Sequence, residues 1–533
     1  MDWAEHSLAE VARTRKARMN QPPPVMDESE TEALLKAWHP DYTEKKRAAR
    51  VGANAHDSLF PEELASLLEA DSLLPDHAPH SELAADLETD ALIVGGGGAG
   101  VTAALALQGS GLKATLTTKL RLGDSNTIMA EGGIQAALGR DDSPGRHFAD
   151  SYLGGRGKSD PDLLRVLCEN GADSILWLTR LGCLFDQNLD GSFRLRKGGG
   201  ASAPRVLTCR DYTGLEIMRV LRDALRQSGA HVMECHAAVE LLDNGAGQVT
   251  GAVLWDSQTG KLTTVSARAV LLATGGSGQL RLQGFPTSNH LGATGDGLVL
   301  AYRQGCRLVH LDRFQYHPSG VCHPEALAGQ LVTESIRSMG AQILNAGGER
   351  FVDEMTYRDV VAAAIVKECK QGRGIDTPSG RRGVWLDTPL VDLKHGSGTL
   401  RRQLPGLAHR FERFGIDPAQ QPILIHPTLH YQNGGVKIDA GGRTEVAGLW
   451  AAGEVAGGLH GTNRLMGNSL LDIIVFGRRA AASIAENLPP HGAPTLTALC
   501  RYREALKELP PRAHRVSPQI YPADCGLEIV VSR

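Results

Sequence analysis

The sequence contains no C-x-x-C pair and no marked excess of either charge. Its nine cysteines are dispersed along 533 residues, which is typical of reduced thiols in a cytosolic protein. The same dispersal argues against an iron–sulfur cluster or a thiolate zinc site in this chain, so no metal site is expected. A net charge of −4 gives no electrostatic reason to expect nucleic acid or an anionic membrane as a partner.

A secretory signal and a transmembrane segment are not expected either. The first residues, Met1 to Glu5, show no basic segment followed by an apolar one. Residues 91–112 carry no charge and are long enough to span a bilayer. We interpret them instead as a buried strand, turn and helix, because they contain seven glycines in a phosphate-loop pattern.

This glycine-rich segment is the first of three with a cofactor-binding pattern. The apolar strand predicted over 90–94 leads into Gly95-Gly96-Gly97-Gly98-Ala99-Gly100, with a helix predicted over 101–108 and a strand over 114–118. G-x-G-x-x-G at the first turn of a β-α-β unit lets a pyrophosphate approach the helix N-terminus closely. The acidic ribose ligand usual about 20 residues further on is absent, and Thr118-Lys119 stands there.

Two later segments suit the same cofactor. Thr274-Gly275 ends the apolar stretch 269–272, and Asp296 follows it; the stretch 444–454 ends in Gly453-Glu454, as in the second nucleotide-contacting segment of two-part FAD domains. Segments near residues 95, 275 and 454 that bind one cofactor imply a discontinuous domain. The insertion that interrupts it covers about 313–431.

Four cationic residues recur in dense local motifs. They are His317 in Q-Y-H-P, Arg358 in Y-R-D, His430 before Tyr431, and Arg464 in G-T-N-R-L-M-G-N-S-L-L. Such a set suits a small substrate with a carboxylate at each end. These motifs also have simpler interpretations. A histidine beside proline, such as His317, is often structural, and Arg358 with Asp359 suits a surface ion pair. Asn468-Ser469, in the motif of Arg464, suits a helix N-cap.

From about residue 88 to 485, these motifs and their order resemble the flavoprotein subunit of the succinate dehydrogenase/fumarate reductase family, which includes L-aspartate oxidase. The resemblance implies an α/β fold, in which a Rossmann-like FAD-binding domain is interrupted by an α+β capping domain, with an N-terminal arm and a short C-terminal tail. The arm is polar and broken by prolines, and we expect two or three short helices in it. The expected units are an N-terminal extension (1–86), the first part of the FAD-binding domain (87–312), the capping domain (313–431), the second part of the FAD-binding domain (432–487) and a C-terminal segment (488–533).

The resemblance also implies roles for individual residues. Arg358 matches the catalytic arginine, and Glu334 and Arg337 match the residues that pass protons to it. Such a relay is needed because arginine, with its very high pKa, is a poor acid by itself. The residues that match the dicarboxylate clamps are His317, Thr333, His430 and Arg464. The expected cofactor-binding residues are Gly95, Gly97, Gly98, Ala99, Gly100, Thr118, Lys119, Ser125, Asn126, Thr127, Glu131, Gly132, Gly133, Thr274, Gly275, Asp296, Glu454, Ser469 and Leu470.

The chain departs from the family in three places. Many respiratory members bind FAD covalently through a histidine where this chain has Asn126, so noncovalent FAD is expected. At the position of Glu131, quinol fumarate reductases also have glutamate, whereas succinate dehydrogenases and aspartate oxidases usually have glutamine. This residue therefore favours fumarate reduction. Only some 45 residues follow the helix expected over 472–487, so docking of the usual iron–sulfur subunit is in doubt, and the arm is a candidate to replace it.

The expected function is that of a flavoprotein subunit that reduces fumarate or oxidises succinate. It would combine hydride transfer at FAD N5 with proton transfer by arginine, and exchange electrons with an iron–sulfur subunit. The alternatives are L-aspartate oxidase and a non-catalytic flavin electron-transfer subunit, and a substituted succinate stays open as a substrate. The expected location is cytoplasmic, on the cytoplasmic face of the membrane if the chain is part of a complex there.

Overall fold

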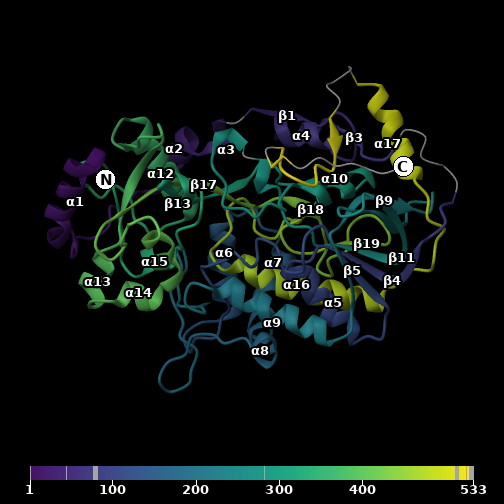
Figure 1. Cartoon of the computed structure of the whole chain (residues 1–533), viewed down its shortest axis with the longest axis horizontal. Coiled ribbons are helices and arrows are strands. Elements are labelled where there is room, and N and C mark those ends of the chain that lie inside the picture. Colours follow the sequence, from purple (N-terminus) through teal and green to yellow (C-terminus); the bar gives the residue numbers. More distant parts are fainter. Residues whose placement is uncertain are drawn as a thin grey trace.

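The computed structural model describes residues 2–43, 45–75, 82–280, 282–509, 515–523 and 525–526. Two bodies lie end to end (Figure 1). The larger is built on a mixed sheet, and the smaller, which we call the cap, on an antiparallel sheet that projects to the left in Figure 1. The α/β fold expected from the sequence is confirmed.

The larger body contains a seven-stranded sheet of order β8-β5-β4-β11-β10-β9, in which β19 also pairs with β11. Its strands are β4 (Leu87–Val94), β5 (Ala114–Thr118), β8 (His231–Glu234), β9 (His236–Asp243), β10 (Val249–Asp256), β11 (Leu262–Leu272) and β19 (Leu449–Ala451). Strands β8, β5, β4, β11 and β19 pair in parallel, and β9 and β10 extend the sheet in antiparallel fashion.

Helix α5 (Gly98–Gln108) connects β4 to the parallel strand β5, as the glycine-rich pattern predicted. It packs against the long helix α16 (Asn468–Glu486), so that the starts of two helices distant in sequence lie side by side. Gly477 of α16 permits this packing, because a Cβ there would lie 2.8 Å from the carbonyl oxygen of Ala99. Gly100 lets α5 approach the end of β4, because a Cβ there would lie 1.9 Å from the carbonyl oxygen of Gly95. The other longer helices of this body are α6 (Pro144–Gly154), α7 (Pro161–Glu169), α8 (Gly171–Arg180), α9 (Thr213–Gln227) and α10 (Asp296–Arg303).

The cap has its own antiparallel sheet and its own core. Its strands are β13 (Phe314–His323), β14 (Gln342–Leu344), β15 (Ile375–Asp376), β16 (Arg382–Asp387) and β17 (Ile423–Gln432), and its helices are α11 (Ser335–Ser338), α12 (Arg358–Lys370), α13 (Leu390–His395), α14 (Thr399–Gln403) and α15 (Pro405–Glu412). Helix α12 packs on β13. Buried Val321, Ile343, Ile365 and Phe411 belong to the cap core.

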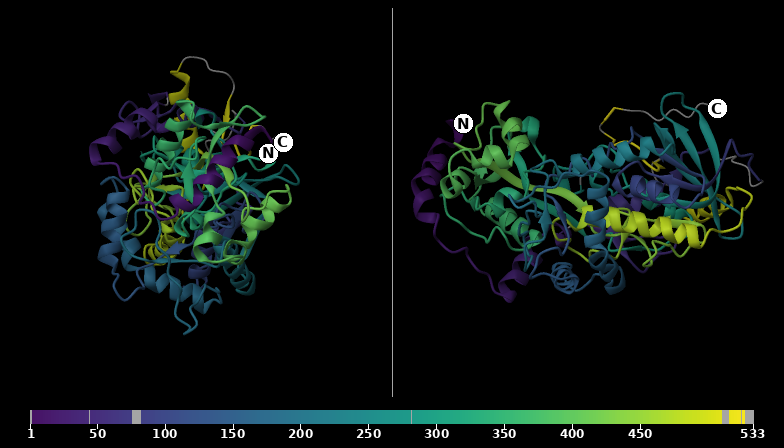
Figure 2. Two further views of the ribbon diagram at one scale, coloured as in Figure 1. Left: turned by 90° about the vertical axis from the view of Figure 1, so that its left-hand side faces the viewer. Right: turned by 90° about the horizontal axis from the view of Figure 1, so that it is seen from below.

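The N-terminal arm covers both bodies. Helices α1 (Glu5–Arg18) and α2 (Glu28–Trp38) lie on the outer side of the cap, shown in purple in Figure 2, and Leu34 and Leu35 join the cap core. Helix α3 (Pro40–Thr43), the paired strands β1 (Lys46–Ala48) and β2 (Leu59–Pro61), and helix α4 (Glu62–Leu68) follow. The described arm thus contains four α-helices, whereas the sequence predicted two or three. Asp27 and Glu30 form a capping box that stabilises the start of α2.

The end of the chain meets the arm. After helix α17 (Thr497–Lys507), strand β21 (Val516–Ser517) pairs in parallel with β3 (Asp71–Ser72) of the arm. A further small sheet joins β12 (Leu308–Val309), β18 (Gly435–Lys437) and β20 (Ala456–Gly457) where the chain enters and leaves the cap. Among the residues given above as described, no helix is long and apolar enough to cross a membrane.

Candidate functional site

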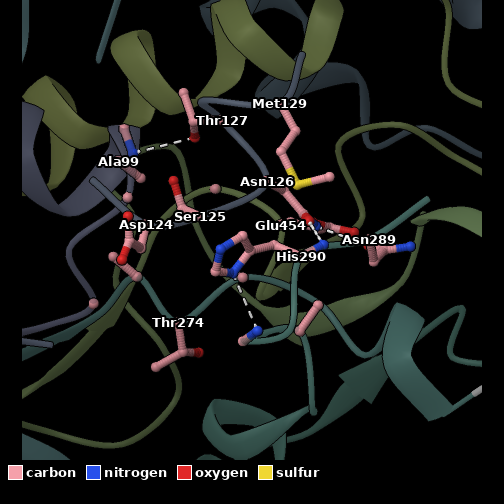
Figure 3. Close-up of a pocket in the computed structure, with 18 of the residues that line it drawn as sticks. Ala99, Asp124, Ser125, Asn126, Thr127, Met129, Thr274, Asn289, His290 and Glu454 are labelled. Atoms are coloured by element: carbon pink, nitrogen blue, oxygen red, sulfur yellow. Dashed lines mark hydrogen bonds between the residues drawn. The ribbon is translucent and has the colours of Figure 1, made fainter. Parts of the chain in front are cut away.

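A cavity of about 570 Å³ lies at the carboxyl ends of β4, β5 and β11 and reaches the cap. The starts of α5 and α16 line it from the larger body, and Arg410 and His430 line it from the cap. Nucleotides bind at this edge of the sheet in open α/β folds. Figure 3 shows the part of the cavity around Asn126.

All of the expected cofactor-binding residues line this cavity except Gly100, Gly132 and Gly133. Gly100 lets α5 approach β4, as described above. Gly133 has a positive φ of 117°, and a Cβ there would lie 2.6 Å from the Leu207 carbonyl oxygen, so this glycine supports the pairing of β6 (Ile134–Gln135) with β7 (Val206–Leu207). At Gly132 the nearest atom to an added Cβ is Met466 Sδ at 3.5 Å.

The cavity fits a dinucleotide. Gly95 has a φ of 126°, and a Cβ there would lie 2.2 Å from the Ala273 carbonyl oxygen, so the loop needs glycine at this point. The first residues of α5 face the cavity, and a helix N-terminus attracts phosphate. The Thr274 hydroxyl, which lines the cavity, is buried and has no hydrogen-bond partner among the residues that the structure describes. Lys119 donates to Asp296 Oδ2 at 2.6 Å, so an acidic side chain reaches the expected ribose position from elsewhere in the chain.

Asn126 is held by hydrogen bonds on both sides of its amide. Its Nδ2 donates to Asn289 Oδ1 at 2.7 Å and to Glu454 Oε2 at 3.1 Å, and its Oδ1 accepts from the backbone N–H of His290 at 2.6 Å. Figure 3 shows these side chains converging. Burial raises the pKa of Glu454. Asn289 was not among the residues expected at the cofactor, although it stands in the stretch between Gly275 and Asp296.

The residues matched to substrate binding and catalysis lie together at the cap end of the cavity. His430 and Arg464 line it, and the rings of His317 and His430 are 5.1 Å apart. The matched residues are buried except His430, which is half-buried. Those that do not line the cavity are His317, Thr333, Glu334, Arg337 and Arg358. Thr333 accepts a hydrogen bond from the Ser335 N–H at its hydroxyl, at the start of α11.

Gln315 brings two arginines together. Arg358 Nη1 and Arg464 Nη2 each donate to Gln315 Oε1 at 2.9 Å. Burial, with a further contribution from Arg358, lowers the pKa of Arg464 to about 10. Gln315 was not predicted from the sequence, although it stands two residues before His317 on β13, the spacing at which strand residues share a face.

Glu334 lies between two guanidinium groups. Arg358 Nε donates to Glu334 Oε2 at 2.8 Å, and Arg337 Nη2 donates to the same oxygen at 3.1 Å. The Gly199 N–H donates to Oε1 at 2.9 Å. Burial raises the pKa of Glu334, but Arg358 and Arg337 outweigh it and lower the pKa to about 2. The carboxylate is therefore charged at neutral pH.

The two histidines are neutral in this environment. Burial lowers the pKa of His317 and of His430 well below the usual value, and Arg358 lowers both further. His430 Nδ1 lies 2.8 Å from Ser288 Oγ. His317 Nε2 is buried and has no hydrogen-bond partner among the described residues. Among all residues that the structure describes, no group of three or more His, Cys, Asp or Glu is arranged to hold a metal ion.

Comparison with known proteins agrees with this geometry. Residues 90–470 match the family described as FAD binding domain. The chain is 37% identical over 436 residues to an L-aspartate oxidase of Streptomyces coelicolor, covering 79% of this chain and 72% of that protein. It is 37% identical over 412 residues to one of the subunits of the CoM/CoB fumarate reductase of Methanothermobacter marburgensis, covering 75% of this chain and 73% of that protein.

Among solved structures, the FrdA protein of E. coli quinol fumarate reductase matches with a TM-score of 0.71 and 31% identity, covering 79% of this chain and 74% of that one. The Sdh1 complex of Mycobacterium smegmatis matches with a TM-score of 0.65 and 34% identity, covering 78% and 72%. FAD is the cofactor of this chain. The protein belongs to the FAD binding domain family, and its relatives there are flavoproteins of the fumarate reductase, succinate dehydrogenase and L-aspartate oxidase type.

Proposed function

We propose that this flavoprotein reduces fumarate, or oxidises succinate in the reverse direction, with Arg358 as the proton-transferring residue. The observation that carries the proposal is the buried row of Arg337, Glu334 and Arg358, joined by hydrogen bonds of 3.1 and 2.8 Å. Arg358 meets the cavity-lining Arg464 at Gln315. These charged residues therefore lead to the cationic end of the cavity, which suits a dicarboxylate.

The proposed clamps act on the substrate's two carboxylates. Arg464 offers a planar guanidinium, and in a buried site its charge-assisted hydrogen bonds are strong and directional. His317 and His430, both neutral, each offer a ring N–H, and Thr333 offers its hydroxyl. Holding both carboxylates fixes the double bond in one orientation, which lowers the entropic part of the barrier.

The loop of Gly95 to Gly98, Asp296 and Glu454 would hold FAD, which when bound supplies the hydride. The chain's own task is then to deliver a proton to the other alkene carbon. Arg358 is a poor acid in water, and it would donate from a guanidinium nitrogen only where another group returns the proton at once. Glu334, which accepts from both Arg358 and Arg337, is placed to pass that proton from Arg337.

The alternative substrate, L-aspartate, would bring an ammonium group into this site. The carboxylates nearest the proposed clamps are already bonded: Glu334 to two arginines, and Glu454 to Asn126 and to the Gln432 N–H. An ammonium group would also lie near the positive charges of Arg358 and Arg464. This balance favours a substrate whose only charges are carboxylates.

The electron partner would be a separate protein that carries iron–sulfur clusters, because the nine cysteines show no cluster-binding spacing. One of the relatives is itself named as a single component of a fumarate reductase with several subunits. We expect the chain expressed alone to contain FAD and no iron, and to show no activity with quinol. We also propose a cytoplasmic location, with any association with the membrane made through partners.

The experiment that tests the proposal is a pair of assays on purified protein. Reduced viologen plus fumarate should give turnover, and L-aspartate plus oxygen should give little. The reverse result would assign the chain to aspartate oxidation. Flavin-containing protein that is inactive in both assays would support the third alternative, a non-catalytic electron-transfer subunit.

A further inference from the structure

A cap arginine that the sequence analysis did not single out reaches the cofactor cavity. Arg410, on α15, forms an ion pair with Glu131, which lies in the larger body directly before Gly132-Gly133. Both side chains line the cavity and are mostly buried, with 22% and 14% of their surfaces exposed. The pair therefore differs from an exposed ion pair, which would contribute little.

Arg410 makes a second contact at the cavity wall. Its Nη1 donates to the Leu331 carbonyl oxygen at 2.8 Å. Leu331 also lines the cavity, and it stands two residues before Thr333 and three before Glu334. One guanidinium thus connects the loop at Glu131 to the cap segment that carries two proposed site residues.

The other end of α15 is docked on the larger body as well. Asp211 accepts from the Leu407 N–H at 2.9 Å and from the Gly406 N–H at 3.3 Å, at the first turn of the helix. Gly406 lets the helix approach closely, because a Cβ there would lie 2.8 Å from the ring of Tyr212. Helix α15 is therefore held across the boundary between cap and larger body at both of its ends.

We propose that Arg410 is a positioning residue of this site, holding the segment of Leu331 to Glu334 against the cofactor loop at Glu131. Without it, the Leu331 carbonyl and the Glu131 carboxylate lose their common partner, and the cap segment is free to move away from the cavity. The kinetic consequence rests on the proposed function, because it concerns turnover of the dicarboxylate. The structural consequence does not.

The charge on Glu131 links this contact to pH. Burial raises the pKa of Glu131 to about 7, an effect that Arg410 reduces and Asp211 increases. The charged groups facing it are Arg410 and Asp211, with the Tyr212 phenol nearby. Only the ionised carboxylate forms the ion pair, so the contact weakens as the pH falls through the pKa of Glu131.

The first test is amide hydrogen exchange on the FAD-loaded protein. Arg410→Gln should make the amides of residues 331–334 exchange at least about tenfold faster, because local opening becomes easier. Arg410→Lys, which keeps the charge, should restore much of the protection. Arg413→Gln, a change at an exposed position beside the end of α15, should leave exchange unchanged. Unchanged exchange in Arg410→Gln, or an equal increase in Arg413→Gln, overturns the proposal.

The second test is kinetic. We expect Arg410→Gln to lower kcat/KM for fumarate at least about tenfold at normal FAD content, with partial recovery in Arg410→Lys. Glu131→Gln should lower kcat/KM similarly and remove the loss of activity on the acid side of the wild-type pH profile. If the loss of activity at acid pH persists in Glu131→Gln, the proposed link between the charge of Glu131 and activity is wrong.

If the wild type does not reduce fumarate, the proposed function fails, and hydrogen exchange still decides the role of Arg410. If Arg410→Gln does not fold, Glu131→Gln must show the faster exchange.

Discussion

Arg358 and Arg464 share one hydrogen-bond acceptor, since each donates to Gln315 Oε1 at 2.9 Å. Two buried guanidinium groups repel each other, and here a neutral amide holds them at the end of the cofactor cavity. Gln315 is fixed in turn, because its Nε2 donates to Asn463 Oδ1 at 3.1 Å and to the Arg464 carbonyl oxygen at 2.6 Å. Glu334 pairs with Arg358, and the remaining positive charge at Arg464 supports the proposed dicarboxylate substrate.

Arg464→Ala should remove a charge-assisted carboxylate contact. We expect a loss of about 3 kcal/mol or more in kcat/KM for fumarate, and weaker competitive inhibition by malonate in parallel. Arg443→Ala, at an exposed ion pair with Asp439, is the matched control and should change neither quantity. If malonate bound Arg464→Ala as tightly as the wild type, the clamp assignment would be wrong.

The pairing of Glu334 predicts a dependence of stability on pH. Arg358 and Arg337, acting against the effect of burial, lower the pKa of Glu334 from 4.5 to about 2. A depressed carboxyl pKa stabilises the folded state above the unfolded-state value, and this contribution is lost as the pH falls from about 4.5 towards 2. Glu334→Gln lacks this titration. Its deficit in the free energy of unfolding, measured with denaturant, should therefore be larger at about pH 7 than at about pH 3. A pH-independent deficit would show that folding does not lower the pKa of Glu334.

Asn126 predicts that FAD is bound without a covalent link. Its amide is engaged with Asn289, Glu454 and the His290 N–H, and an amide does not form the bond that a histidine forms in covalent flavoproteins. Acid precipitation should release all of the flavin into the supernatant. Flavin fluorescence that stays with the denatured polypeptide on a gel would refute this prediction.

The sequence predicted the local parts of this molecule better than its long-range contacts. The β4-α5-β5 unit follows from glycine spacing and apolar runs, which act within a few residues. The motif resemblance named Arg358, Glu334 and Arg337, which the structure joins by hydrogen bonds. Gln315 and Arg410 were missed because their partners lie up to about 280 residues away in the chain, and no local pattern marks such a pairing. The arm was expected to contain two or three short helices; the described arm contains four, and Leu34 and Leu35 of α2 pack in the cap core.

The arm contacts predict a specific stability effect in the cap. Asp387 is fully buried and accepts from Arg15 Nε at 2.8 Å and from Arg18 Nη2 at 3.0 Å. Asp387→Ala leaves the buried Arg18 without its anionic partner, which should cost about 3–5 kcal/mol in the free energy of unfolding. Asp376→Ala, at an exposed pair with Arg382, should cost less than about 0.5 kcal/mol. Equal effects in denaturant unfolding would mean that the arm does not stabilise the cap through this pair.

The proposed proton-transfer role of Arg358 is tested most directly by the reoxidation of reduced flavin by fumarate, followed anaerobically in a stopped-flow spectrometer. This single turnover needs no partner protein. In the wild type, fumarate should reoxidise the flavin rapidly. In Arg358→Lys, at equal FAD content, we expect reoxidation to be at least about a thousandfold slower, while Arg382→Lys, at a half-exposed cap position paired with Asp376, behaves as the wild type. Reoxidation of Arg358→Lys at close to the wild-type rate would contradict the proposed role of Arg358.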